Sequence, residues 1–113
     1  MDAPLLSTAG GVVRLLNTAG GRVLCLAGAV DVAAVESFVR RYGREPARVD
    51  AIDAGSVTSL SPSALELVLD HLDVAERAGR RIPLRPSAPV ERMLARATSQ
   101  HRHDGGAAQQ TAV

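Results

Sequence analysis

Short apolar segments alternate with amphipathic segments along most of this chain, and this alternation limits the folds that it can adopt. The patterns predict strands over residues 12–18, 22–28, 47–55 and 81–86, and helices over residues 31–43, 61–79 and 87–98. Gly20 and Gly21 favour a tight reversal between the first two strands, which should form an antiparallel hairpin. The later strands are joined through helices, and right-handed crossovers make them parallel. We therefore expect an α/β fold, a small mixed sheet of about four strands packed with about three helices.

Two of the predicted strands also indicate their surroundings. In residues 22–28, Val23, Cys25 and Ala27 alternate with two leucines, so both faces of the strand are apolar. Such a strand is typical of a sheet that is covered on both sides, where the cysteine packs as a small hydrophobe rather than acting as a redox sensor. Pro83 cannot donate a ladder hydrogen bond, so the last strand should lie at an edge of the sheet.

The length of 113 residues corresponds to one domain, large enough to fold around a core without disulfides or metals. We expect a flexible N-terminus over residues 1–11, a single domain over residues 12–98 and a polar, disordered tail over residues 99–113.

Composition and charge exclude several classes of partner. The formal net charge is +1, which provides no strong field for nucleic acid or for a membrane surface. No apolar run approaches the ~20 residues that span a bilayer, and no signal peptide opens the chain. Cys25 is the only cysteine, which suits a reducing compartment, and we expect a cytoplasmic protein. All basic side chains are arginine, and this bias, with abundant Ala, Gly and Val, is typical of a GC-rich bacterial genome.

The clearest helix is predicted over residues 31–43. Asp31 is a favourable N-cap, and Gly43 favours the left-handed conformation that ends a helix. Apolar residues recur at helical spacing and should form the buried stripe; they are Val32, Val35, Phe38, Val39 and Tyr42.

The next predicted helix begins in a cluster of hydroxyl groups around one proline. Pro62 suits the first helical position, which makes Ser61 the N-cap. Ser63 and Glu66 would form a capping box if the helix began two residues later, but the fixed φ of proline favours Ser61. A helix N-terminus beyond the carboxyl end of a parallel strand is also where open α/β sheets place their sites, and it tolerates an anion.

Three motifs, in this order and spacing, resemble the STAS domain, the module of bacterial anti-sigma factor antagonists. LAGAVD (residues 26–31) is similar to the family's Gly-Glu-Leu-Asp step from strand to helix, with Gly28 and Asp31 matching. AIDAGSVTSLSPSAL (residues 51–65) is similar to the central motif, in which a strand ending in Asp leads through a loop to Asp-Ser-Ser-Gly-Leu. AERAGRRIPLRPSAPVERML (residues 75–94) is similar to the passage from the second helix through the last strand to the last helix.

The central motif departs from the family pattern at its key position. Ser61 stands in place of the Asp, Pro62 in place of the phosphorylatable serine, and Ala64 in place of the Gly. The resemblance therefore implies an antagonist without the usual phosphoacceptor. Three outcomes stay open: an antagonist that is not switched off by phosphorylation, one in which Ser61 or Ser63 is a substitute acceptor, or a domain with another binding role.

The resemblance implies partner switching in transcription regulation. The partner would be an anti-sigma factor, a serine kinase of the histidine-kinase-type ATPase fold, whose capture frees a sigma factor. We expect a contact surface made by Asp31, Val57, Thr58, Ser59, Ser61, Pro62, Ser63, Glu66 and Asp70. Asp53 would position the loop that leads to Ser61 through backbone N–H groups.

Other functions have weaker support. Some stand-alone domains of this family are regulatory subunits of transporter or sensory complexes, and a homodimer is possible. No nucleophile–base pair, phosphate-binding loop or metal cluster indicates an enzyme, a cofactor or a metal. His101, His103 and Asp104 are expected to be solvated rather than metal ligands, and His71 is expected on the surface. The arginines at positions 80, 81 and 85 lack interleaved aromatic residues, which favours a solubilising edge.

Overall fold

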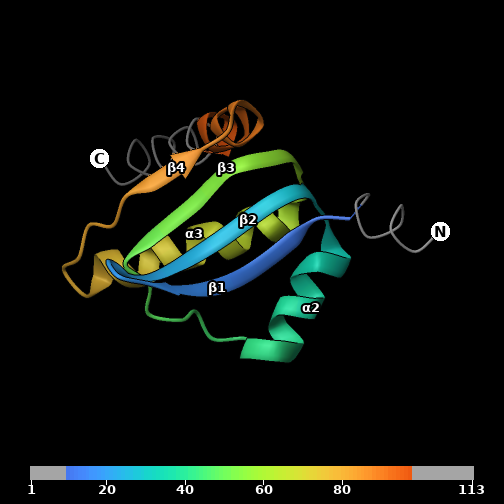
Figure 1. The fold of residues 1–113 in the computed structure, drawn as a ribbon. Helices are drawn as coiled ribbons and strands as arrows, with labels where there is room; N and C mark the ends of the chain where they lie inside the picture. Colours follow the sequence, from blue (N-terminus) through green and yellow to red (C-terminus); the bar gives the residue numbers. More distant parts are fainter. Residues whose placement is uncertain (1–9, 98–113) are drawn as a thin grey trace, which may run out of the picture.

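Four strands form one mixed sheet in the order β1-β2-β3-β4 (Figure 1). The structure is a computed structural model that describes residues 10–97. The strands are β1 (Val12–Thr18), β2 (Gly21–Val30), β3 (Ala51–Leu60) and β4 (Leu84–Pro86). The first two pair antiparallel, and the pairs β2–β3 and β3–β4 are parallel. The helices are α2 (Val32–Tyr42), α3 (Pro62–Arg77) and a last helix described over residues 88–97. The predicted fold class is confirmed.

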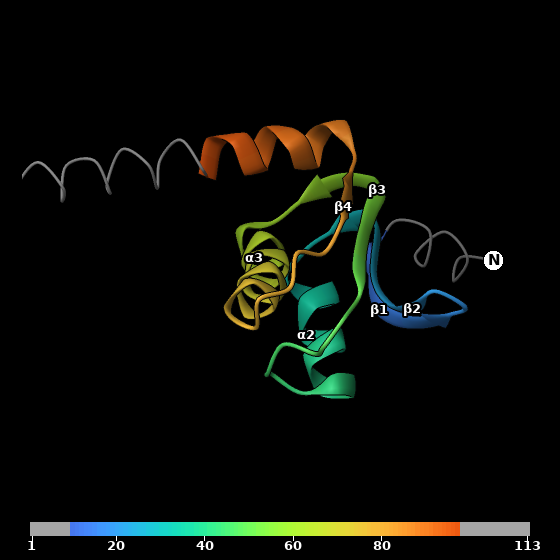
Figure 2. The same ribbon diagram turned by 90° about the vertical axis from the view of Figure 1, so that its left-hand side faces the viewer.

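The helices α2 and α3 both lie on one face of the sheet (Figure 2). Leu24 and Leu26 of β2 point to this face and are fully buried. Val23, Cys25 and Ala27 point to the opposite face and are only half-buried. The prediction that this strand is covered on both sides is therefore wrong. Small apolar side chains such as Ala and Cys are tolerated on an open face, and their hydropathy alone does not show whether they are covered.

Strand β3 begins four residues later and ends five residues later than predicted, and it contains two irregularities. Its pairing with β2 slips once between Cys25 and Ala27 and again between Gly28 and Ala29. At each slip β3 carries one extra residue, which is the pattern of a β-bulge. The buried positions of β3 are consequently spaced by two and then by three residues; they are Ile52, Ala54, Val57 and Leu60. This broken alternation explains why the sequence pattern placed the strand at residues 47–55 and predicted a loop after it.

Helix α2 begins and ends where the sequence predicts. The Asp31 carboxylate accepts a hydrogen bond from the backbone N–H of Ala34, and Gly43 follows the last turn with a φ of 94°. The buried stripe is rotated from the predicted one, because Ala34 and Phe38 face the core and Val32 is 52% exposed. The prediction overlooked Ala34, since alanine contributes little to a hydropathy pattern.

His71 of helix α3 is a buried residue, so the prediction of a surface histidine is wrong. Its exposed fraction is 1%, and both ring nitrogens have partners. The backbone N–H of Ala47 donates to Nε2 at 3.1 Å, and Nδ1 lies 2.8 Å from the carbonyl oxygen of Leu67. A ring that accepts at Nε2 carries its proton on Nδ1, which donates to Leu67. His71 thereby joins α3 to the segment that precedes β3.

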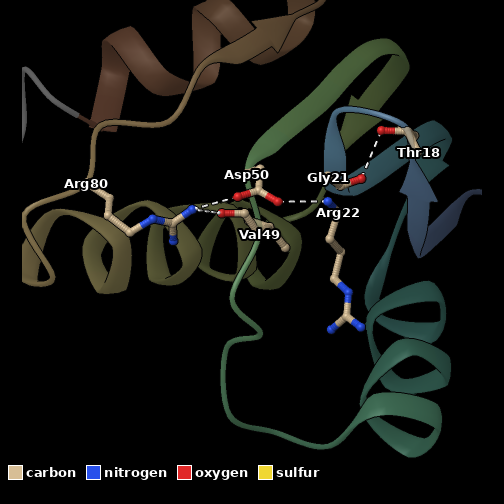
Figure 3. Close-up of polar contacts among 6 residues, drawn as sticks. All are labelled: Thr18, Gly21, Arg22, Val49, Asp50 and Arg80. Atoms are coloured by element: carbon tan, nitrogen blue, oxygen red, sulfur yellow. Dashed lines mark hydrogen bonds and ion pairs between the residues drawn. The ribbon is translucent and has the colours of Figure 1, made fainter.

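The carboxylate of Asp50 links several segments at one end of the sheet, the end that lies away from the starts of α2 and α3 (Figure 3). Asp50 accepts from the backbone N–H of Arg22 at 2.8 Å and pairs with the guanidinium of Arg80 at 3.0 Å. Arg80 also donates to the carbonyl oxygen of Val49 at 2.8 Å. Gly21 has a φ of 123°, and a Cβ there would overlap the Asp50 side chain. Asp50 therefore connects the β1–β2 hairpin, the start of β3 and the segment after α3.

The two edges of the sheet are β1 and β4, and the edge position predicted for the last strand is confirmed. The carbonyl oxygen of Pro83 accepts a hydrogen bond from the backbone N–H of Ile52 at 2.9 Å. This bond needs no N–H from the proline. Residues 10–97 contain no helix with the length and hydrophobicity needed to cross a membrane.

Candidate functional site

The candidate site is the edge of the sheet where two helices start side by side. Strands β2 and β3 end at a paired position, Val30 with Leu60. The next residue in each chain segment is the N-cap of a helix, Asp31 before α2 and Ser61 before α3. The backbone N–H of Ser61 donates to the carbonyl oxygen of Val30 at 2.9 Å. Parallel pairing thus places the two helix N-termini at the same level, at the carboxyl ends of their strands.

The sequence predicts both caps correctly. The carboxylate of Asp31 accepts from Ala34 N–H at 3.0 Å, and the hydroxyl of Ser61 accepts from Ala64 N–H at 3.2 Å. Pro62 occupies the first turn of α3, where a missing N–H leaves no intrahelical bond unmade. The alternative frame, with Ser63 as the N-cap, is not the one that the chain adopts.

Ser61 and Ser63 form a pair of hydroxyl groups at the start of α3. Their oxygen atoms lie 3.1 Å apart, and either one can be the donor. Both residues are half-buried. The first turns of α2 and α3 contain no Asp or Glu. A phosphate on either hydroxyl would lie at the positive end of the α3 dipole, and the nearest N-cap carboxylate would be that of Asp31 at the start of α2.

The remaining predicted contact residues fall into two groups. Six of them are exposed around the two helix starts and along α3: Asp31, Thr58, Ser59, Pro62, Glu66 and Asp70. Val57 is the exception, because it is only 2% exposed and belongs to the core. The β-bulge that follows it in β3 turns Thr58 and Ser59 to the surface and keeps Val57 inside. Val57 is therefore removed from the predicted contact surface.

Asp53 does not hold a loop, because its neighbours continue as a strand. Its carboxylate accepts from the N–H of Gly55 at 3.0 Å, two residues further on, inside the first bulge of β3. Asp53 also raises the pKa of the Cys25 thiol. Burial is the largest cause of that increase, the Asp53 charge adds to it, and the nearby Arg14 charge opposes it.

Sequence reasoning missed one feature of the site, an open groove beside Ser63. The groove has a volume of about 360 Å³, and Val32, Val35 and Val39 of α2 line one side of it. These valines were assigned to the core, so the sequence pattern gave no reason to expect them next to a hydroxyl at the surface. The rotation of α2 that buries Ala34 and Phe38 is what turns this apolar side toward the start of α3.

Among residues 10–97, no three His, Cys, Asp or Glu side chains are grouped so that they could hold a metal ion. The predicted solvated stretch with His101, His103 and Asp104 lies outside the described residues. Comparisons of this chain with models of protein families, with curated proteins and with solved structures find no match.

Proposed function

We propose that this protein is an interaction module that acts as an anti-sigma factor antagonist in bacterial transcription regulation. In this proposal, the surface around the starts of α2 and α3 binds an anti-sigma factor of the histidine-kinase-type ATPase fold and so releases a sigma factor. The module performs no catalysis of its own.

The observation that supports the proposal most directly is the pairing of the two N-caps, Asp31 and Ser61. The resembling family uses the corresponding strand-to-helix steps, and here those steps lie side by side, joined by the hydrogen bond from Ser61 to Val30. The rigid first turn at Pro62 is exposed beside them. A preformed turn loses little conformational entropy on binding, which favours recognition by shape.

The half-buried hydroxyls suggest how the usual phosphorylation cycle would change. Pro62 has no hydroxyl, and Ser61 already accepts from Ala64 at 3.2 Å. A kinase would have to break this cap before it could align Ser61 with a phosphoryl donor. We therefore expect antagonism that is largely insensitive to phosphorylation, with Ser63, whose hydroxyl does not cap the helix, as the acceptor if one is used.

Co-purification tests the partner. The full chain, tagged and expressed in its own cells, should recover an ATPase-type anti-sigma factor, which is then titrated against the purified chain. Recovery of transporter or sensory subunits alone would instead support the other family role. Recovery of neither class would contradict the proposal.

Two matched variants test the surface. Glu66→Arg and Glu76→Arg make the same charge change on exposed positions of the same helix, one near its start and one near its end. The first should weaken binding of the anti-sigma factor at least about tenfold, which is ~1.4 kcal/mol, and the second should change it less than about twofold. Equal effects of the two variants would show that the start of α3 is not the contact surface.

Phosphorylation is tested by incubation with the recovered partner and ATP. A mass increase of one phosphate that disappears in Ser63→Ala but persists in Ser61→Ala would identify Ser63 as the acceptor. No increase in the wild-type chain would support a constitutive antagonist.

A further inference from the structure

The two edges of the sheet differ in how they are protected from an additional strand. Strand β4 has three residues, follows Pro83 and ends in Pro86, so its outer edge offers few donors. Strand β1 has seven residues and no proline. No strand within residues 10–97 pairs with its outer side. Alternate residues of such an edge direct their N–H and C=O groups outward, where they can pair with another chain.

Residues of β1 and α2 line an open groove at this edge. The two elements lie next to each other in Figure 1. The groove has a volume of about 710 Å³. Val12 and Leu16 of β1 and Tyr42 of α2 line it, and all three are exposed large hydrophobic residues. The groove therefore combines unpaired strand backbone with apolar surface, as peptide-binding domains that recruit an extra strand do.

The charged side chains that line the groove are all positive. Arg14, Arg40 and Arg41 line it, and the residues that line it include no Asp or Glu. Neither ion pair found in the described part of the chain involves these three arginines. Two of the arginines are held in place: Arg40 donates to Ser37 at 3.4 Å, and the Arg41 guanidinium lies 5.7 Å from the centre of the Tyr42 ring.

We propose that this groove binds an extended acidic segment of another protein, which pairs with β1 as a fifth strand. Side chains of a strand alternate between its two faces, so one set would point toward Arg41 on α2 and the other would lie beside Arg14. A second copy of this chain is a poor occupant, because pairing two β1 edges would bring both sets of arginines together. This site is separate from the anti-sigma surface and does not depend on it.

The test uses the full chain and a fluorescent hexapeptide, Val-Glu-Val-Glu-Val-Glu, in an anisotropy titration. The peptide should bind saturably below about 1 mM, and it should perturb backbone amide resonances at residues 12–18 and 37–42. The basic peptide Val-Lys-Val-Lys-Val-Lys should bind at least about tenfold more weakly. The acidic peptide with N-methyl groups on two consecutive central amides should lose binding by a similar factor, because it cannot pair along either edge.

Matched double variants locate the site. The variant with Arg14→Glu and Arg41→Glu should weaken peptide binding at least about tenfold. The control with Arg81→Glu and Arg92→Glu makes the same charge change at exposed positions elsewhere and should change binding less than about threefold. The groove variant should still bind the anti-sigma factor, which separates this proposal from the proposed function.

Three results would overturn the proposal. They are the absence of saturable binding, equal losses in the two double variants, and amide perturbations confined to the start of α3. Concentration-dependent dimerisation through β1 in analytical ultracentrifugation would assign the edge to a second copy and would also overturn it.

Discussion

At the scale of single residues, partial burial and two neighbouring charges determine the chemistry of Cys25. The thiol is half-buried in β2, and its strand partners on the two sides are Arg14 of β1 and Asp53 of β3. Burial raises the pKa of the Cys25 thiol most, the Asp53 carboxylate raises it further, and the Arg14 guanidinium lowers it. The thiolate, which is the reactive form, is therefore scarce at neutral pH.

Alkylation kinetics should report these contributions. In the native full chain, the rate of Cys25 alkylation by iodoacetamide should reach half its maximum at a pH above the ordinary thiol value of about 8.5. Asp53→Asn removes a negative charge and should move that midpoint to lower pH, while Arg14→Ala removes a positive charge and should move it to higher pH. A midpoint that shifts in the same direction in both variants would contradict the electrostatic explanation.

His71 shows at the same scale why a residue type does not predict its location. The ring is buried between α3 and the segment before β3, and it satisfies the N–H of Ala47 and the carbonyl of Leu67. Buried polar groups are retained where they have partners, and those partners come from distant parts of the chain. Sequence inspection showed carboxylates near His71 in the helix but could not show Ala47.

At the scale of elements, the position at which helix α3 begins is specified by residues that are close to it in the sequence. Proline at the first position, a serine before it and a left-handed Gly79 after the last turn all agree, and the structure adopts this frame. The Ser61 hydroxyl accepts from Ala64, so it compensates one of the N–H groups that a helix start leaves unpaired.

Capping variants should separate the two serines. Ser61→Ala should lower the free energy of unfolding by about 1 kcal/mol. Ser61→Asp should keep most of the wild-type free energy of unfolding, because a carboxylate can also cap the helix. The exposed Ser59→Ala should change it by less than about 0.5 kcal/mol. Urea denaturation monitored by circular dichroism provides the comparison. A larger loss in Ser63→Ala than in Ser61→Ala would mean that Ser63 is the functional cap.

At the scale of the whole molecule, the two ends of the sheet differ in the polar residues that they present. At the carboxyl end of β2 and β3, exposed hydroxyl and acidic residues surround the two helix starts. At the opposite end, Asp50 joins three segments through Arg22 and Arg80 (Figure 3). Such a link stabilises the relative positions of distant elements at the end of the sheet that lies away from the proposed contact surface.

The described residues contain two ion pairs that can be compared, Asp50 with Arg80 between distant segments and Asp73 with Arg77 within helix α3. Asp50→Ala should lower the free energy of unfolding by about 1–2 kcal/mol, because it removes the partly exposed Arg80 pair and leaves the Arg22 N–H without its acceptor. Asp73→Ala removes the exposed pair with Arg77 within α3 and should lower it by less than about 0.5 kcal/mol. Similar losses in urea denaturation would show that Asp50 contributes only a surface ion pair.

The sequence by itself determined the order of elements, the hairpin, the parallel crossovers and both helix caps. The hairpin and the caps depend on residues that are close along the chain, such as Gly20 with Gly21 or Ser61 with Pro62, through backbone sterics and capping bonds. The parallel direction follows from the order of elements and the handedness of crossovers. The edge position of β4 also followed from one residue, Pro83, through its missing donor.

Only the tertiary structure decided which apolar side chains are covered. Pairing between β2 and β3 introduces the two bulges that bury Val57, and packing of α2 on the sheet buries Ala34 and exposes Val32. The open face around Cys25 likewise depends on where the helices lie, and the edge position of β1 depends on the strand order. A hydropathy pattern records how apolar each residue is, but burial depends on neighbours that are distant in the chain, and those are fixed only when the elements pack together.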